Sequence, residues 1–190
     1  MTAPRVVVVG AGIGGLAVAL ALQRAGLRPR VLEQAPTLGD VGAGISISPN
    51  AAKGLAFLGL GEALAADACI PPVQVTRHFR TGEPLLTIDR SDSLERYGAP
   101  YYQLHRGDLH AMLLGAVRAH DAGAVTVASG VQGVRLEEAG IEVALGDGRR
   151  LQADLLVGAD GLRSTVRAAL FADQPPQFSG YVAWRGLVPA

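Results

Sequence analysis

The chain has 190 residues, of which 49% are hydrophobic and 18% charged, so it is long and apolar enough to bury a substantial core. Its 17 basic residues balance its 17 acidic residues, and a formal net charge of zero gives no reason to expect nucleic acid or an anionic membrane as a partner. The single cysteine, Cys69, excludes an internal disulfide and a cysteine-based metal cluster, and we expect it to be a small buried apolar residue.

The stretch that follows Arg5 predicts a strand, a glycine-rich turn and a helix. Val6–Val9 has the composition of a buried parallel strand. Gly10, Gly12 and Gly15 then stand at G-x-G-x-x-G spacing. The first of these glycines permits a tight turn, the second lets the backbone approach a pyrophosphate, and the third lets the helix lie close on the sheet. Unpaired N–H groups at the helix N-terminus would face the phosphates, so the stretch predicts a dinucleotide site.

A second strand, Val31 and Leu32, ends on the acid Glu33. Its carboxylate can accept hydrogen bonds from both hydroxyls of an adenosine ribose, whereas a 2′-phosphate would meet like charge, so NADP is disfavoured at this site. Two alternatives stay open: a glycine-rich helix start without a ligand, and a signal peptide. The glycines at 10, 12, 14 and 15 argue against the signal peptide, and the uncharged run is short for a membrane span. With no targeting segment, we expect a cytoplasmic protein.

The middle of the chain alternates between short helices and strands. Pro71-Pro72 is the clearest break, and Thr81-Gly82 predicts a turn between two strands. The four histidines, at 78, 105, 110 and 120, show no metal-binding spacing, so we interpret them as structural or surface residues and expect no metal site. The predicted elements are a strand at 45–48, a helix from 49 to about 58, a short helix to about 68, strands at 73–80, 85–88 and 101–105, and a helix at 108–120.

The last third of the chain predicts an antiparallel meander and a second glycine turn. Strands are predicted at 125–128, 131–136 and 141–145, with Gly146-Asp147-Gly148 as a hairpin turn before a further strand at Leu151. A short apolar strand, 154–159, leads into Gly158-Ala159-Asp160-Gly161. Phe178–Val188 predicts a last strand.

Asp160 and the residues after it form the second motif with chemical meaning. An acid at a strand end, followed by Gly161 and a helix that begins at Ser164, is typical of a turn that faces a polyanion, and Asp160 can hold a ribityl or ribose hydroxyl. Arg163 and Arg167 add positive charge on one helix face. The alternative is an ordinary strand–turn–helix with Ser164 as its N-cap.

Taken in order, the motifs resemble those of the FAD-dependent aromatic-ring hydroxylases, single-component flavoprotein monooxygenases similar to salicylate and hydroxybenzoate hydroxylases. The resemblance rests on the first glycine motif with Glu33, on Arg106-x-Asp108-Leu109, and on Asp160-Gly161 with Ser164 and Arg167. It implies an α/β fold: a Rossmann-like parallel sheet with helices, an antiparallel β-meander and the start of a β-rich substrate domain. Residues 1–175 would be the FAD-binding domain, with substrate-domain strands inserted at about 72–105, and 176–190 would begin the substrate-binding sheet.

The resemblance also implies roles for the matched positions. Glu33 would bind the adenosine ribose, Arg106 would reach the phosphate or ribityl region, and Val131 would meet the adenine through its backbone. Asp160, with Gly161, would bind FAD hydroxyls and, with the nearby arginines, influence binding of the nicotinamide coenzyme. The pyrophosphate would lie along Gly10, Gly12, Ile13, Gly14 and Gly15, and Gly44 belongs to a stretch that runs along the flavin.

The implied function is hydroxylation of a phenolic or benzoate-like substrate with FAD as cofactor, dioxygen as oxidant and NADH or NADPH as transient co-substrate. No catalytic acid or base is predicted, since the flavin carries the chemistry. The family's third FAD motif, a Gly-Asp dipeptide followed by Ala, His and Pro, has no counterpart, so we expect an N-terminal portion of a longer protein rather than a naturally short relative. The alternatives are an FAD-dependent epoxidase or tailoring oxygenase on a polycyclic substrate, and a flavin-binding remnant without activity. The sequence does not specify the oligomeric state.

Overall fold

A computed structural model describes residues 3–39, 42–171 and 175–184. The chain divides into two compact units, one formed by residues 1–40 and 110–190 and the other by residues 41–109. Each unit has its own sheets and helices.

The first unit is built around a parallel sheet. In the described residues its order is β11-β1-β2-β7, with every neighbouring pair parallel. Val8 of β1 pairs with Val31 of β2, and both side chains are fully buried, which confirms the predicted buried strand. Because parallel strands need a crossover, helix α1 joins β1 to β2. The bounds are β1 Val6–Val9, α1 Ile13–Arg24, β2 Pro29–Leu32, β7 Val125–Thr126 and β11 Leu155–Gly158.

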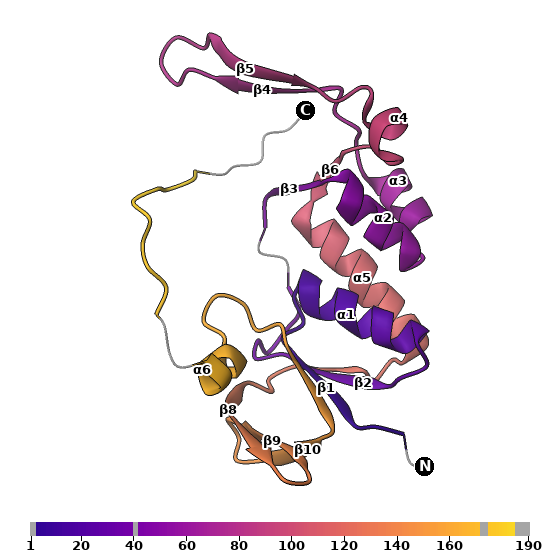
Figure 1. Cartoon of the computed structure of the whole chain (residues 1–190), viewed down its shortest axis with the longest axis vertical. Helices are drawn as coiled ribbons and strands as arrows, with labels where there is room; N and C mark the ends of the chain where they lie inside the picture. Colours follow the sequence, from indigo (N-terminus) through magenta and orange to yellow (C-terminus); the bar gives the residue numbers. More distant parts are fainter. Residues whose placement is uncertain (1–2, 40–41, 172–174, 185–190) are drawn as a thin grey trace. The chain divides into compact units, whose positions relative to one another are not determined.

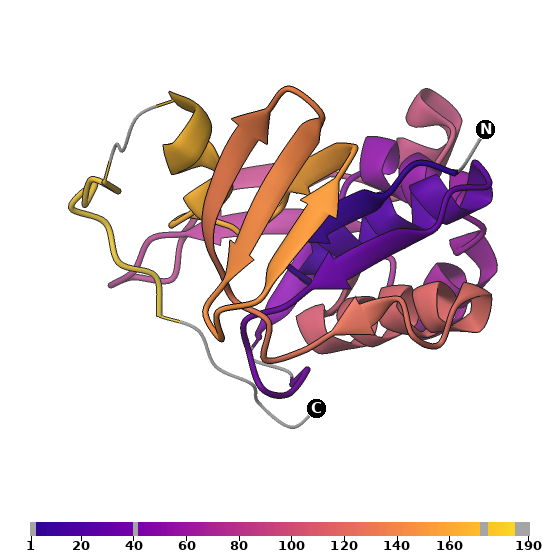
Figure 2. The ribbon, with the colours of Figure 1, turned by 90° about the horizontal axis from the view of Figure 1, so that it is seen from below.

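An antiparallel meander covers one face of this sheet, and α1 covers the other (Figures 1 and 2). Successive residues of a strand point to opposite faces, so Val7 and Val9 point to the meander, where they pack with Val143 and Leu145. This arrangement confirms the predicted Rossmann-like α/β fold with an antiparallel meander. The first strand predicted for the meander, at 125–128, is instead β7 of the parallel sheet and spans only Val125–Thr126. The meander strands are β8 Val131–Glu137, β9 Gly140–Leu145 and β10 Arg150–Ala153, in the order β10-β9-β8.

Two more helices complete this unit. Helix α5, Arg106–His120, begins in the second unit and contributes its residues from His110 onward to the first. Its residues Leu113 and Val117 are fully buried, and the side chain of Gln23 on α1 donates to the Val117 carbonyl oxygen at 3.2 Å. Helix α6, Thr165–Phe171, follows β11 and packs through Val166 into the same apolar cluster as the meander.

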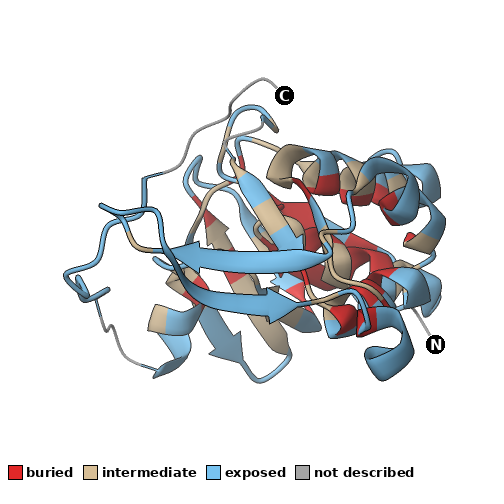
Figure 3. Cartoon of the chain, turned by 90° about the horizontal axis from the view of Figure 1, so that it is seen from above, coloured by how far each residue is buried: buried red, intermediate tan, exposed pale blue. Residues whose placement is uncertain are grey.

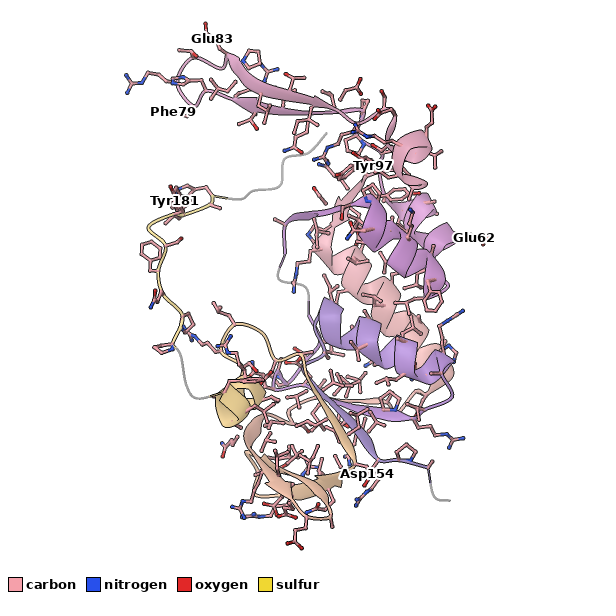
Figure 4. All side chains as sticks on the ribbon, in the orientation of Figure 1. Glu62, Phe79, Glu83, Tyr97, Asp154 and Tyr181 are labelled. Atoms are coloured by element: carbon pink, nitrogen blue, oxygen red, sulfur yellow. The ribbon has the colours of Figure 1, made fainter. Side chains whose placement is uncertain are left out.

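In its described residues, the second unit holds two antiparallel strand pairs and three short helices besides the start of α5. Strand β3, Gly44–Ile47, pairs with β6, Tyr102–His105, whereas β4, Val73–Arg77, and β5, Pro84–Asp89, form a hairpin. All residues of the two hairpin strands are exposed, and both strands are pale blue along their length in Figure 3. Phe79 and Glu83 lie near its tip (Figure 4). The helices are α2 Pro49–Phe57, α3 Gly61–Asp67 and α4 Ser93–Tyr97.

Two further predictions from the sequence are wrong. Cys69 is exposed rather than buried. Its backbone, and not its side chain, makes the structural contact, since its N–H and carbonyl pair with those of Gln103 in an isolated bridge. The predicted last strand fails as well: residues 178–184 form no strand, and residues 185–188 lie outside the described part.

None of the helices in the described ranges is long and apolar enough to cross a membrane. Across the same ranges, no group of three or more His, Cys, Asp or Glu residues is placed to hold a metal ion.

Candidate functional site

A groove of the first unit lies where β1, β2 and β11 end. In open parallel sheets this carboxyl edge is where ligands bind, because the loops that follow neighbouring strands diverge there. The strand ends contribute Val9 and Leu32, and the glycine turn, the loop after β2, the start of β8 and the turn before α6 supply the rest. The lining residues are Val9, Gly10, Gly12, Leu32, Glu33, Gln34, Ser129, Val131, Ala159, Asp160, Gly161, Arg163 and Thr165.

The three motif glycines have different surroundings. Gly10 has φ +99°, and a Cβ there would lie 2.4 Å from the carbonyl oxygen of Ala159. At Gly15 a Cβ would lie only 1.9 Å from the carbonyl oxygen of Gly10. A Cβ at Gly12 would meet nothing within 4 Å. The fold therefore requires glycine at the first and third positions, as predicted, whereas Gly12 faces open space on the groove.

Glu33 is tied to the backbone on both sides of its strand end. One carboxylate oxygen accepts the Ala11 N–H at 2.8 Å, and the other accepts the Ala35 N–H at 2.9 Å. Each oxygen keeps a further lone pair for a ligand donor. The acid thus holds the glycine turn in place and still presents acceptors to the groove.

The turn after β7 packs against the loop after β2. The Ala128 N–H donates to the Ala35 carbonyl at 2.9 Å, and the Ser129 N–H donates to the Glu33 carbonyl at 2.7 Å. Ala128 has φ +49°, a left-handed conformation that is uncommon outside glycine, and Ser129 is buried. These bonds bring Val131, at the start of β8, to the groove beside Glu33.

Asp160 serves the fold as well as lining the groove. Its carboxylate accepts the Ser164 hydroxyl at 2.5 Å and the Val166 N–H at 3.2 Å. The Ser164 hydroxyl oxygen in turn accepts the Arg167 N–H at 2.9 Å. Ser164 is therefore an N-cap, as the structural alternative predicted, and Asp160 fixes the start of α6 through it.

The structure brings most of the predicted site residues together, though not all of them. Gly10, Gly12, Glu33, Val131, Asp160 and Gly161 line the groove, and Ile13, Gly14 and Gly15 form the first turn of α1 directly after it. Gly44 and Arg106 belong to the second unit, where Gly44 begins β3 and the Arg106 N–H donates to the Ala43 carbonyl at 3.0 Å.

Sequence reasoning did not assign six of the lining residues to the site: Val9, Leu32, Gln34, Ser129, Ala159 and Thr165. Val9 and Leu32 were predicted only as strand ends, and Ala159 only as part of the second glycine turn. Gln34 and Thr165 each follow a residue that was recognised as a strand end or helix start, so extending those motifs by one residue would have included them. Ser129 precedes Gly130 in a turn whose geometry depends on the tertiary contacts of Glu33, and no local pattern marks it.

Comparisons with known proteins identify a family for this chain. A family model described as "FAD binding domain" matches residues 4–187. The 3-amino-4-hydroxybenzoate 2-monooxygenase PtnB3 of Streptomyces platensis is 44% identical over 193 residues, covering 98% of this chain and 46% of that protein. The aurachin C monooxygenase/isomerase of Stigmatella aurantiaca is 42% identical over 183 residues, covering 96% of this chain and 46% of that protein.

Among solved structures, Klebsiella pneumoniae HpxO complexed with FAD and uric acid is similar, with a TM-score of 0.79 and 29% identity. The match covers 91% of this chain and 43% of HpxO. The chain spans about half the length of the curated relatives that it matches.

Proposed function

The chain belongs to the FAD-binding domain family, and we propose that it binds FAD in a monooxygenase that uses NAD(P)H and dioxygen to hydroxylate a phenolic or benzoate-like substrate. The family match confirms the predicted resemblance and FAD as the cofactor. The observation that carries the proposal is the groove at the sheet edge, in which an unobstructed glycine backbone, the N-terminus of α1 and a strand-end carboxylate come together.

The groove fits FAD on the grounds of space and chemistry. The open position at Gly12 leaves room for a pyrophosphate against the backbone, and the N-terminal N–H groups of α1 suit its negative charge. Glu33 offers carboxylate acceptors to the two hydroxyls of the adenosine ribose. Val131 would contact the adenine from the start of β8.

The remaining predicted residues would contact other parts of FAD. Asp160 and Gly161 would reach a hydroxyl from the second turn, with Asp160 using lone pairs that the α6 cap leaves free. Gly14 would lie beside the pyrophosphate with Ile13. Gly44 and Arg106 are proposed to contact the flavin and its phosphate or ribityl region.

Bound FAD supplies the redox chemistry of the reaction. This chain's part is to hold the cofactor: backbone N–H groups neutralise phosphate charge, and Glu33 fixes the adenosine end. Neither NADH nor NADPH is favoured, because FAD occupies the glycine motif and Glu33 therefore acts on the FAD ribose. A cytoplasmic location, and domain boundaries at about 72–105 and 176–190, stay predictions.

The benzoate-like substrate rests on the Streptomyces relative, whose name specifies an aminohydroxybenzoate. A second candidate function, a tailoring oxygenase, is favoured by the Stigmatella relative, whose name combines monooxygenation with isomerisation. The two candidates differ in substrate and share the FAD groove.

The experiment is a substrate screen with the full-length protein under labelled dioxygen. A hydroxybenzoate or aminohydroxybenzoate should speed NAD(P)H oxidation and acquire one labelled oxygen atom. Faster NAD(P)H oxidation and labelled product only with larger polycyclic compounds would favour the tailoring oxygenase. No incorporation with any compound would contradict both candidates.

A further inference from the structure

His110, on α5, is hydrogen-bonded to the glycine turn from which it is separated by 99 positions in the sequence. Its Nε2 atom lies 2.7 Å from the carbonyl oxygen of Ala11, and the contact is partly buried. Because a carbonyl oxygen only accepts, Nε2 must carry the hydrogen in this contact. His110 and Ala11 both belong to the first unit.

Ala11 is thus held at both of its backbone groups by side chains. Its N–H donates to Glu33 at 2.8 Å, and its carbonyl accepts from His110. The residue itself is 1% exposed. On the N-terminal side, the Gly10 N–H donates to the Leu32 carbonyl at 2.7 Å. The turn is therefore anchored up to the carbonyl of Ala11.

The next backbone group along the chain is the N–H of Gly12, which lines the groove. The carbonyl of Ala11 and the N–H of Gly12 belong to one planar trans peptide, in which they point in opposite directions. Whatever fixes the carbonyl therefore fixes the N–H. Gly12 has no side chain, and its carbonyl accepts the Leu16 N–H at 2.9 Å, which holds the peptide after it. The bond from His110 is the side-chain contact that holds the Ala11–Gly12 peptide at its carbonyl.

We propose that His110 is a positioning residue of the pyrophosphate site: its bond to Ala11 orients the Gly12 N–H toward the groove before FAD arrives. This inference rests on the proposed function, because it assumes that FAD places its pyrophosphate there. Fixing the backbone of one residue in advance corresponds to about five- to thirtyfold in affinity. The histidine that sequence reasoning assigned to a structural or surface role would thus act on the binding step.

Two amide variants that differ by one methylene group test the role. In His110→Gln the amide nitrogen has about the reach of Nε2 and can still donate to Ala11, whereas in His110→Asn it stops short. His120→Asn is the matched control, because His120 ends the same helix and lines a different hollow, with Gln23 and Arg28. FAD affinity is measured by flavin fluorescence, and exchange of the Ala11 amide hydrogen is measured without FAD.

His110→Asn should weaken FAD binding about five- to thirtyfold and speed exchange of the Ala11 amide. His110→Gln should keep most of the FAD affinity and of the slow Ala11 amide exchange of the wild type. His120→Asn should change neither the affinity nor the exchange rate. Equal losses in the Gln and Asn variants would show that the ring only packs and would overturn the proposal, as would wild-type affinity and exchange in His110→Asn. If the wild-type protein binds no FAD, the proposed function fails, while the exchange rates still decide whether His110 orders the turn.

Discussion

Substitution of Gly15 by alanine tests the packing of α1 on the glycine turn. A Cβ at this position would lie 1.9 Å from the Gly10 carbonyl oxygen, whereas real Cβ atoms essentially never come closer than 3.0 Å. The helix or the turn must therefore move by at least the difference, 3.0 minus 1.9 Å, or 1.1 Å. The obstructing atom is backbone, so no side-chain rotation relieves the contact.

Overpacking of this kind costs about 1–3 kcal/mol, and we expect the upper end because both partners are backbone. For a domain of this size, about 3 kcal/mol lowers the melting temperature by roughly 6–12 °C. The assay is thermal unfolding followed by circular dichroism without FAD, so that only the packing of the protein is measured.

Gly14→Ala is the matched control. It lies one residue earlier in the same helix, and its Cβ would meet nothing within 4 Å. Alanine in a helix is favoured over glycine by up to about 1 kcal/mol, so this variant should unfold at the same or a slightly higher temperature. An unchanged melting temperature in Gly15→Ala, or an equal loss in both variants, would refute the close-packing argument.

Three further predictions concern the groove and the sheet. Gly12→Val should abolish FAD binding more completely than Gly14→Val, because Gly12 lines the groove and Gly14 does not; equal losses in a fluorescence titration would contradict the assigned register. Glu33→Gln should weaken FAD at least roughly tenfold, since two charge-assisted bonds of about 1.5–3 kcal/mol each are impaired, and unchanged affinity would place the ribose elsewhere. The Arg5 guanidinium and the Arg5 N–H both donate to the carboxylate of Asp154 (labelled in Figure 4) and hold the pKa of Asp154 at about 2. The stability that these bonds contribute is therefore present above about pH 4 and is lost as the pH falls through about 2. Asp154→Asn should flatten that part of the acid-unfolding profile, and an unchanged profile would refute the assignment.

The sequence predicted the part of the fold that local chemistry determines. The bounds of Val6–Val9 are those of β1, and Glu33 follows β2 as expected. Glycine spacing and strand composition are short-range signals, so the elements they specify can be predicted without knowledge of the tertiary structure. The same holds for Ser164, whose capping bond to the Arg167 N–H spans three residues.

Features that depend on distant partners were missed or mispredicted. The apolar pattern around Tyr181 predicts a strand, but a strand also requires a pairing edge, and the described residues 175–184 pair with none. Cysteine is a residue type that is often buried, yet Cys69 is exposed, and the structural contact it makes is the backbone pairing with Gln103. The hydrogen bond between His110 and Ala11 joins positions that are far apart in the sequence, and no local sequence pattern predicts it.

The central claim is that the groove at the carboxyl edge of the parallel sheet holds FAD. The most direct test is to release the tightly bound nucleotide from the purified full-length protein by heat and to identify it by chromatography. The account predicts FAD, with a more complete loss of that FAD in Gly12→Val than in Gly14→Val. Recovery of NAD or NADP with no flavin would contradict it.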